Sequence, residues 1–176
     1  WNDAIADEVL RKEDAVDHYE DVLGTYLVKL SAKHLSVDDN RTVNTLLHTI
    51  GDFERVSDHA VNLIKTAEEI RDKSIKFSDE ALGDLSVLEA AVQDIVNRTV
   101  DALQKGDTYA AKKIEPLEQV VDGLVREVKS RHIARLQAGA CTIEYGFVLD
   151  DLLTNYERIA DHCSNIAVAM IEVAAD

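Results

Sequence analysis

The chain has 176 residues, with 34 Asp or Glu against 19 Lys or Arg, and its formal net charge is −15. Nucleic-acid binding depends on clustered Lys and Arg, so this balance argues against a nucleic-acid partner and favours divalent cations as counterparts. No apolar run approaches the roughly 18 residues needed to cross a bilayer, so no direct membrane insertion is predicted.

The composition predicts an all-α fold with short connections. A single Pro and seven Gly accompany 46% apolar residues, many of them Ala, Val and Leu. The two cysteines, Cys141 and Cys163, lack the close spacing of a zinc or redox motif, and no secretory signal precedes them. These features favour a cytoplasmic protein. Because the chain begins at Trp1 inside helical sequence, it is expected to be part of a longer one.

Apolar residues at helical spacing predict five long helices. Their approximate ranges, in chain order, are 4–33, 39–73, 78–103, 107–137 and 142–174. Gly106 is expected to end the third helix, and Asp107 is expected to cap the fourth. Pro116 falls inside the fourth helix, and since Pro lacks an N–H, we expect a kink there.

One stretch of the fifth predicted helix repeats a stretch of the second. Residues 157–166 read ERIADHCSNI and residues 54–63 read ERVSDHAVNL, at a constant offset of 103 positions. In both copies the Glu and the Asp are four residues apart, so on a helix they lie on one face, one turn apart. Two carboxylates so placed can reach one cation. The chain is therefore predicted to contain a duplicated helical unit.

The duplication extends to a second pair of helices. Glu118 and Asp122 in the fourth helix correspond to Glu13 and Asp17 in the first, at an offset of 105. In each pair a carboxylate follows an apolar core position by one residue, about 100° around the helix. The acids are thus expected at the margin of the packed face. Two helices packed at about 8–10 Å would bring two such margins together.

The repeated block, a Glu-x-x-x-Asp pair followed by a His and an Asn, resembles the PhoU family of helical, phosphate-linked regulatory proteins. The resemblance implies a non-enzymatic helical bundle of two tandem repeats, residues 1–76 and 77–176, that form one compact domain. Family repeats have three helices each, whereas this sequence predicts five helices. The first repeat is therefore expected to lack one helix, the counterpart of the helix at about 78–103.

Within the family, residues 25–31 (TYLVKLS), which lead toward the first block, are most like the cytosolic PhoU-like domain of sodium/phosphate cotransporter-type proteins. This resemblance implies a regulator of phosphate transport at the cytosolic face of the membrane. It also implies a transporter membrane domain upstream in the same polypeptide, and a homodimer. The alternatives are a free-standing PhoU regulator of phosphate uptake signalling and a metal-free helical dimerisation scaffold.

The same resemblance implies two carboxylate-rich metal sites, with iron or zinc as the ion. Converging acids repel one another unless they are solvated, protonated or bound to a cation, and carboxylate clusters between helices hold metal ions in other bundles. Oxygen ligands by themselves leave Mg, Ca, Mn, Fe and Zn open. The candidate ligands are Glu13, Asp17, Glu54 and Asp58 in one site and Glu118, Asp122, Glu157 and Asp161 in the other.

Six residues beside these ligands are expected to support the sites or hold the helices together: Arg55, His59, Asn62, Arg158, His162 and Asn165. His59 and His162 stand five residues past a Glu, about 140° around the helix, so they are expected to face another helix or solvent rather than the metal. Asn62 and Asn165 continue the acidic face, where their side chains could hold the adjacent helix by hydrogen bonds.

Ordinary surface salt bridges are the alternative interpretation of the acids. Arg55 and Arg158 have a geometry that suits phosphate, but nearby acids favour salt bridges. In the first helix, two other pairs four residues apart are alternatives to the pair Glu13 and Asp17: Asp14 with His18, and Asp17 with Asp21. The sequence contains no Ser/His/Asp arrangement, Gly-rich phosphate loop or nucleotide motif, so no catalytic residue is predicted.

Overall fold

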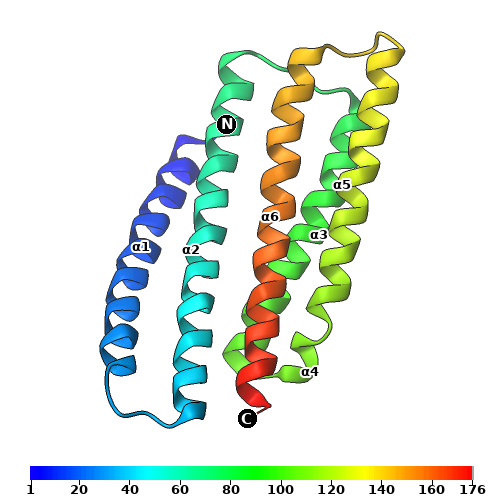
Figure 1. Ribbon diagram of the computed structural model, residues 1–176. Helices are drawn as coiled ribbons and strands as arrows, with labels where there is room; N and C mark the ends of the chain where they lie inside the picture. Colours follow the sequence, from blue (N-terminus) through cyan, green and yellow to red (C-terminus); the bar gives the residue numbers. More distant parts are fainter. Residues whose placement is uncertain (176) are drawn as a thin grey trace.

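The computed structural model describes residues 1–175, which form an all-helical bundle (Figure 1). Consecutive long helices run in opposite directions, so α1, α3 and α6 point one way and α2 and α5 the other. The all-α fold predicted from the composition is confirmed. In chain order the helices are α1 (Asp3–Ser31), α2 (Val37–Asp72), α3 (Asp79–Lys105), α4 (Thr108–Ala111), α5 (Ile114–Gln137) and α6 (Ile143–Ala174).

The helix ends follow side-chain and backbone chemistry. Ser36, Ser78 and Thr142 begin α2, α3 and α6, and each side-chain oxygen accepts a hydrogen bond from a backbone N–H of the first turn. Gly106 ends α3 in the left-handed conformation, with φ of 61°, which a residue without a Cβ adopts at little cost. Asp107 then caps α4, as predicted for the start of the fourth helix.

The fourth predicted helix is divided into α4 and α5. The break falls at Lys112 and Lys113, and α5 runs unbroken from Ile114 to Gln137. Pro116 lies in the first turn of α5, where a backbone N–H has no partner within the helix. Its missing N–H therefore costs nothing, and the kink predicted within a helix interior does not arise.

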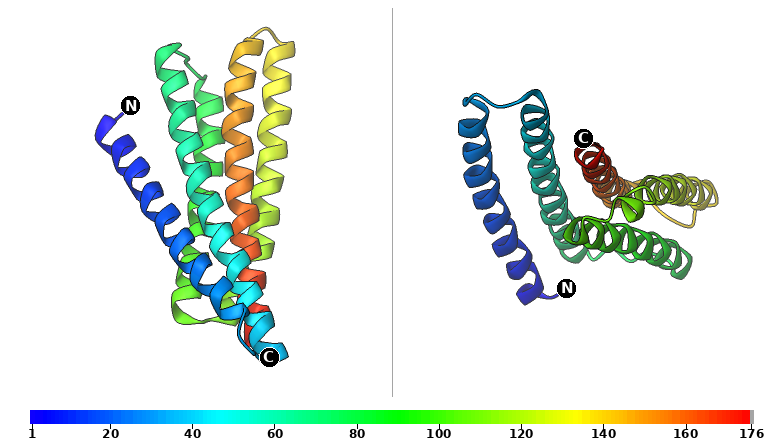
Figure 2. Two further views of the ribbon diagram at one scale, coloured as in Figure 1. Left: turned by 60° about the vertical axis from the view of Figure 1, so that its left-hand side comes forward. Right: turned by 90° about the horizontal axis from the view of Figure 1, so that it is seen from below.

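Helices α2 and α6 lie side by side and antiparallel in the middle of the bundle (Figures 1 and 2). Helix α1 packs on the outer side of α2, α5 packs on α6, and α3 packs against both α5 and α6. The core is concentrated among α3, α5 and α6, and burial of one large aliphatic side chain there contributes about 1.5–3 kcal/mol. Its fully buried members include Leu88, Ile95, Ile114, Leu153 and Ala160.

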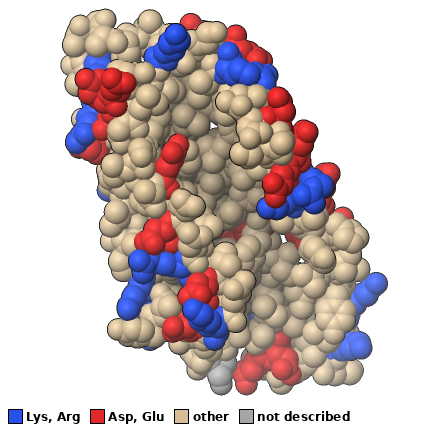
Figure 3. Space-filling model, turned by 180° about the vertical axis from the view of Figure 1, so that it is seen from behind, with Lys and Arg blue, Asp and Glu red and all other residues tan. Residues whose placement is uncertain are grey.

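The first repeat has no counterpart of α3 in the part of the chain that the structure describes. Large apolar residues of α1 therefore remain exposed, among them Ile5, Tyr19, Leu23 and Tyr26. The face seen in Figure 3 is hollowed along its middle, and mainly uncharged residues line the hollow. The boundary predicted at residues 76 and 77 falls in the connection between α2 and α3, and the division into two repeats there stays a prediction.

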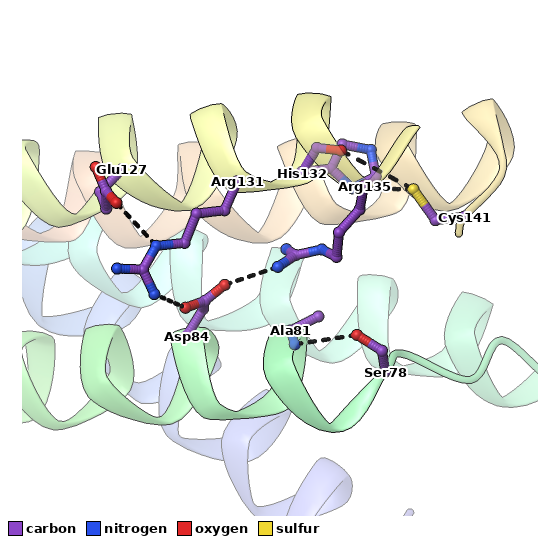
Figure 4. Close-up of polar contacts among 8 residues, drawn as sticks. All are labelled: Ser78, Ala81, Asp84, Glu127, Arg131, His132, Arg135 and Cys141. Carbon is purple, nitrogen blue, oxygen red and sulfur yellow. Dashed lines mark hydrogen bonds and ion pairs between the residues drawn. The ribbon is translucent and has the colours of Figure 1, made fainter. Parts of the chain in front are cut away.

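A charged cluster fixes α3 against α5 (Figure 4). The side chain of Asp84 on α3 is only 8% exposed, and it pairs with Arg131 at 2.7 Å and Arg135 at 3.0 Å. Arg131 also pairs with Glu127, one turn earlier on α5, at 2.8 Å. Because Asp84 is largely withdrawn from water, its charge depends on these two guanidinium groups.

Candidate metal centre

Three predicted ligands converge between α5 and α6. Glu118 and Asp122 of α5 and Asp161 of α6 each place one carboxylate oxygen within 4.8 Å of the other two, and all three residues are partly buried. Metal ions bind carboxylate oxygens at about 2.0–2.6 Å, so one ion between these oxygens could contact all three residues with small side-chain movements. Across residues 1–175, no other group of three His, Cys, Asp or Glu residues comes this close.

Core packing places these acids at the groove between the two helices. Asp122 follows Val121, which is 1% exposed, and Asp161 follows Ala160, which is fully buried. One residue is about 100° around a helix, so each acid lies beside the packed stripe and points to its edge. The contact between α5 and α6 brings the two edges together.

The electrostatics of this cluster favour a cation. The pKa of Glu118 is raised, first by its partial burial and then by the charges of Asp122 and Asp161, with a smaller effect of Glu157. The charge of Glu157 therefore reaches the cluster, although Glu157 is not one of the three residues whose oxygens converge. Asp122 Oδ1 is buried and has no hydrogen-bond partner within residues 1–175. An unpaired buried carboxylate oxygen is costly, and a bound cation would compensate it.

Basic residues at the edge of the cluster offer little compensation. Arg126 approaches Asp122 at 3.9 Å, and Arg158 approaches Asp161 at 3.4 Å. Both Arg side chains are more than half exposed, and exposed ion pairs contribute only about 0–1 kcal/mol. The residues present therefore fit a metal ion better than they fit a closed network of salt bridges.

The four candidate ligands between α1 and α2 converge less closely. The pKa of Glu54 is raised by burial, then by the charge of Asp58 and by a side-chain hydrogen bond between the two. Burial, Asp17 and, across the helix pair, Asp58 raise the pKa of Glu13. Acids of both helices thus face a common space. Asp17 and Asp58 are exposed, and no three of the acids here meet the separation seen between α5 and α6.

The two His residues of the repeated blocks meet at the contact between α2 and α6. The rings of His59 and His162 are stacked, with centroids 5.7 Å apart. His162 Nδ1 lies 2.9 Å from Asp52 Oδ1, and His59 Nδ1 lies 2.8 Å from Asn155 Oδ1. Asn165 also donates to Asp52 Oδ1, at 3.3 Å. These residues hold the two central helices together and do not join the carboxylate cluster.

Sequence reasoning missed Asp52 and Asn155. Both lie two residues before the Glu of their block, and they are separated by the same offset of 103 positions. Asp52 and Asn155 are different residues, so a search for identical residues in the two copies passes over them. Both nevertheless carry a side-chain oxygen that a His can contact. The offset was the signal that could have identified them.

The remaining predicted residues differ between the repeats. Arg158 pairs with Asp161 in its own block, whereas Arg55 makes no hydrogen bond or ion pair within residues 1–175 and lines a cavity. The Asn62 side chain makes no hydrogen bond there, and its backbone carbonyl accepts one from Thr66. Cys163 is a buried core residue, and burial raises the pKa of its thiol to about 11.

Two acid-bearing helical hairpins, joined through matched polar residues on α2 and α6, define a duplicated helical bundle with carboxylate sites. The family model described as PhoU domain matches residues 2–67 and 85–170, so each matched segment contains one copy of the repeated block. The chain belongs to the PhoU family.

Curated relatives carry the same family name. The chain is 21% identical over 173 residues to the phosphate-specific transport system accessory protein PhoU homolog 1 of Thermotoga maritima. The matched region covers 98% of this chain and 74% of that protein. The chain is 25% identical over 167 residues to the corresponding PhoU homolog of Zymomonas mobilis, spanning 94% of the chain and 69% of that protein. A third such homolog, from Aquifex aeolicus, is 25% identical over 162 residues, spanning 89% and 70%.

A solved structure confirms the fold. The crystal structure of PhoU from Pseudomonas aeruginosa superposes with a TM-score of 0.87 at 20% identity, covering 98% of this chain and 82% of that one. The PhoU-like bundle inferred from the repeated block is therefore confirmed.

The narrower assignment within the family is wrong. The three relatives are named as accessory proteins of a phosphate-specific transport system, and none is named as part of a sodium/phosphate cotransporter. The assignment to a cotransporter-type protein and the expected partner, an upstream transporter membrane domain, are both overturned. Residues 25–31, which suggested them, lie in the last turns of α1, where Leu27 is buried and Leu30 half-buried. Packing against α2 accounts for Leu27 and Leu30, whereas Tyr26 and Val28 of the same segment are exposed.

None of the helices that the structure describes is both long and apolar enough to cross a membrane.

Proposed function

We propose that this chain is a non-catalytic, cytoplasmic regulator that assists phosphate transport and uses its paired carboxylates to hold metal ions. Its membership of the PhoU family and the names of its relatives support the link to phosphate transport. The carboxylate cluster between α5 and α6 supports the metal. The main observation is the buried, unpartnered Asp122 Oδ1 beside Glu118 and Asp161, because a cation is the simplest partner for it.

The ligands restrict the ion that the site would take. Carboxylate oxygens suit hard and borderline cations, such as Mg, Ca, Mn, Fe and Zn, and offer nothing to ions that need sulfur ligands. The family resemblance favours iron or zinc. A bound ion would neutralise the repulsion among the acids and tie α5 to α6, and Glu157, whose charge reaches Glu118, is the fourth ligand that we propose.

Metal content is the first test. Protein purified without chelator or affinity metal is analysed by plasma mass spectrometry, beside the double variant Asp122→Ala/Asp161→Ala. We expect a transition metal in near-stoichiometric amount that falls in the variant. The variant Asp94→Ala/Asp101→Ala removes two acids of α3 whose side chains are about half exposed and pair only with neighbours on their own helix, and it should keep the metal.

A corresponding variant separates the two sites. Glu54→Ala/Asp58→Ala removes the acids of α2, where convergence is weaker, so its effect on metal content is expected to be smaller. Absence of metal after reconstitution with iron, zinc and manganese would contradict the metal proposal. The chain would then act as a metal-free helical scaffold.

Transport regulation is tested separately in cells. A bacterium that lacks its own PhoU accessory protein would receive the full-length gene for this chain, and uptake of labelled phosphate would be measured at high and low phosphate. Restored control by the intact gene, and its loss with Asp122→Ala/Asp161→Ala, is the expected result. Restoration by both versions would separate regulation from the metal, and restoration by neither would contradict the link to phosphate transport.

The homodimer that the family resemblance implies stays a prediction. Light scattering coupled to size exclusion would measure the mass in solution, and a single 19.5 kDa species would contradict it.

A further inference from the structure

A cavity of about 560 Å³ opens between α2 and α6, apart from the carboxylate cluster. Small-molecule sites usually have volumes of about 300–1,000 Å³ and combine apolar walls with a few polar groups. Here Leu47, Val168 and Ala169 supply apolar surface. The polar groups come from His48, Asp52, Arg55, Asn165 and Glu172.

Arg55 supplies an unpaired guanidinium group. It makes no hydrogen bond or ion pair within residues 1–175, in a chain with 34 acidic residues. Its counterpart in the second block, Arg158, pairs with Asp161. A guanidinium presents five N–H donors in a planar fork that matches phosphate and carboxylate groups. Arg55 is therefore suited to bind an oxyanion in the cavity.

The cavity also offers acceptors on both helices, Asp52 on α2, one turn before Arg55, and Glu172 on α6. Asp52 is 9% exposed, and its Oδ1 takes both the hydrogen bond of Asn165 and the contact with His162. Asp52 Oδ2 makes no bond within residues 1–175 and is not enclosed, so it can accept from a molecule in the cavity. Glu172 adds an exposed carboxylate. These two carboxylates would repel a bare anion, but they would accept hydrogen bonds from hydroxyl groups.

We propose that this cavity binds a small organic oxyanion that also carries hydroxyl groups. The oxyanion accepts hydrogen bonds from Arg55, and the hydroxyl groups donate to Asp52 and Glu172. A phosphate ester and a carboxylate share this chemistry, and the volume accommodates a molecule of sugar-phosphate size. The contact with His162 fixes the buried Asp52 carboxylate before a ligand arrives.

Gly51 offers a way to fill the cavity without disturbing the core. It lines the cavity, and a Cβ added there would meet no heavy atom within 4 Å. Its counterpart at the offset of 103 is Thr154. Gly51→Ala is therefore a neutral control for packing, whereas Gly51→Leu places a large side chain in the space proposed for the ligand.

The test is calorimetric titration with ribose 5-phosphate, gluconate and inorganic phosphate. We expect saturable binding of ribose 5-phosphate or gluconate, and the one that binds identifies the oxyanion as a phosphate ester or a carboxylate. Arg55→Gln should weaken binding by about tenfold or more, because charge-assisted hydrogen bonds are lost. Gly51→Leu should abolish binding, while Gly51→Ala and Arg98→Gln, an exposed Arg on α3, should leave it unchanged.

Circular dichroism and thermal unfolding confirm that each variant folds. Titrations of the protein as purified are repeated after dialysis against chelator, so that binding to a metal ion is recognised. The proposal is overturned if none of the three compounds binds, if binding disappears with the metal, or if Arg55→Gln binds as tightly as the unchanged protein. Inorganic phosphate binding as tightly as ribose 5-phosphate would overturn the role given to the hydroxyl groups.

Discussion

His59 and His162, which occupy the same place in the two repeated blocks, stack against each other with centroids 5.7 Å apart and an interplanar angle of 24°. Each contacts a residue two positions before the Glu of the other block, Asn155 for His59 and Asp52 for His162. The contacts are therefore reciprocal, as expected for two copies related by an approximate two-fold axis. One copy uses a neutral Asn and the other a carboxylate.

Asp52→Ala is expected to destabilise the contact between α2 and α6. It removes the acceptor of His162 and Asn165, and a buried polar group without a partner costs about 1–3 kcal/mol. For a chain of this size, each kcal/mol lowers the melting temperature by about 2–4 °C. Asp52→Asn, which introduces the residue found at the equivalent position 155, should lower the melting temperature less than Asp52→Ala does. Equal melting temperatures for Asp52→Ala and the unchanged protein would contradict this role.

Glu118→Gln should stabilise the metal-free protein at neutral pH. Burial and neighbouring acids raise the pKa of Glu118 above its ordinary value of 4.5, so its ionised form opposes folding. A higher pKa in the folded state means that stability falls as pH rises from about 4.5 through the folded pKa, and the loss persists above it. Gln carries no charge and removes this loss.

When metal is bound, Glu118→Gln should destabilise the protein instead, because Gln is a poorer metal ligand than a carboxylate. Thermal unfolding at several pH values, with and without metal, measures both effects. Glu8→Gln, at an exposed residue paired with Lys12, serves as the control and should show neither effect. Destabilisation of the metal-free protein by Glu118→Gln would show that the acids are compensated within the chain.

Asp84→Asn should loosen α3 from α5. The 8% exposed carboxylate of Asp84 pairs with both Arg131 and Arg135, and removal of one partner from such a cluster costs about 3–5 kcal/mol when burial is complete. Because Arg131 is about half exposed, we expect about 2 kcal/mol in urea unfolding. Asp101→Asn breaks an exposed pair with Lys105 on one helix and should cost at most about 0.5 kcal/mol. Similar losses of unfolding free energy in Asp84→Asn and Asp101→Asn would contradict the proposed role of the Asp84 cluster in holding α3 to α5.

Gly146→Ala should disturb the start of α6. The added Cβ would lie 2.7 Å from Nε2 of His132, whose ring is partly buried, so the imidazole must shift. Overpacking of this kind costs about 1–3 kcal/mol. Gly83→Ala, where nothing lies within 4 Å, should instead stabilise α3 by up to about 1 kcal/mol. If the clash is the cause, His132→Ala will relieve the effect of Gly146→Ala in a double-mutant cycle.

The helices and their duplication were accessible from sequence because both depend on local patterns. Apolar spacing located each long helix to within a few residues, and Gly106 and Asp107 marked a real boundary. The kink predicted at Pro116 was wrong because the sequence pattern did not show that a new helix begins at Ile114. Pro is tolerated in the first turn of a helix, although it disrupts a helix interior. The narrower family assignment failed because it relied on one short apolar segment of α1, which does not distinguish one branch of the family from another.

The sequence by itself determined that this is a two-repeat helical protein with acid pairs one turn apart, because side-chain spacing along one helix is fixed by 3.6 residues per turn. Only the tertiary structure decided which acids meet, since convergence across two helices depends on how they are rotated and how closely they pack. Glu118, Asp122 and Asp161 meet between α5 and α6, whereas the equivalent acids of α1 and α2 stay more open. The same packing left Arg55 facing a cavity.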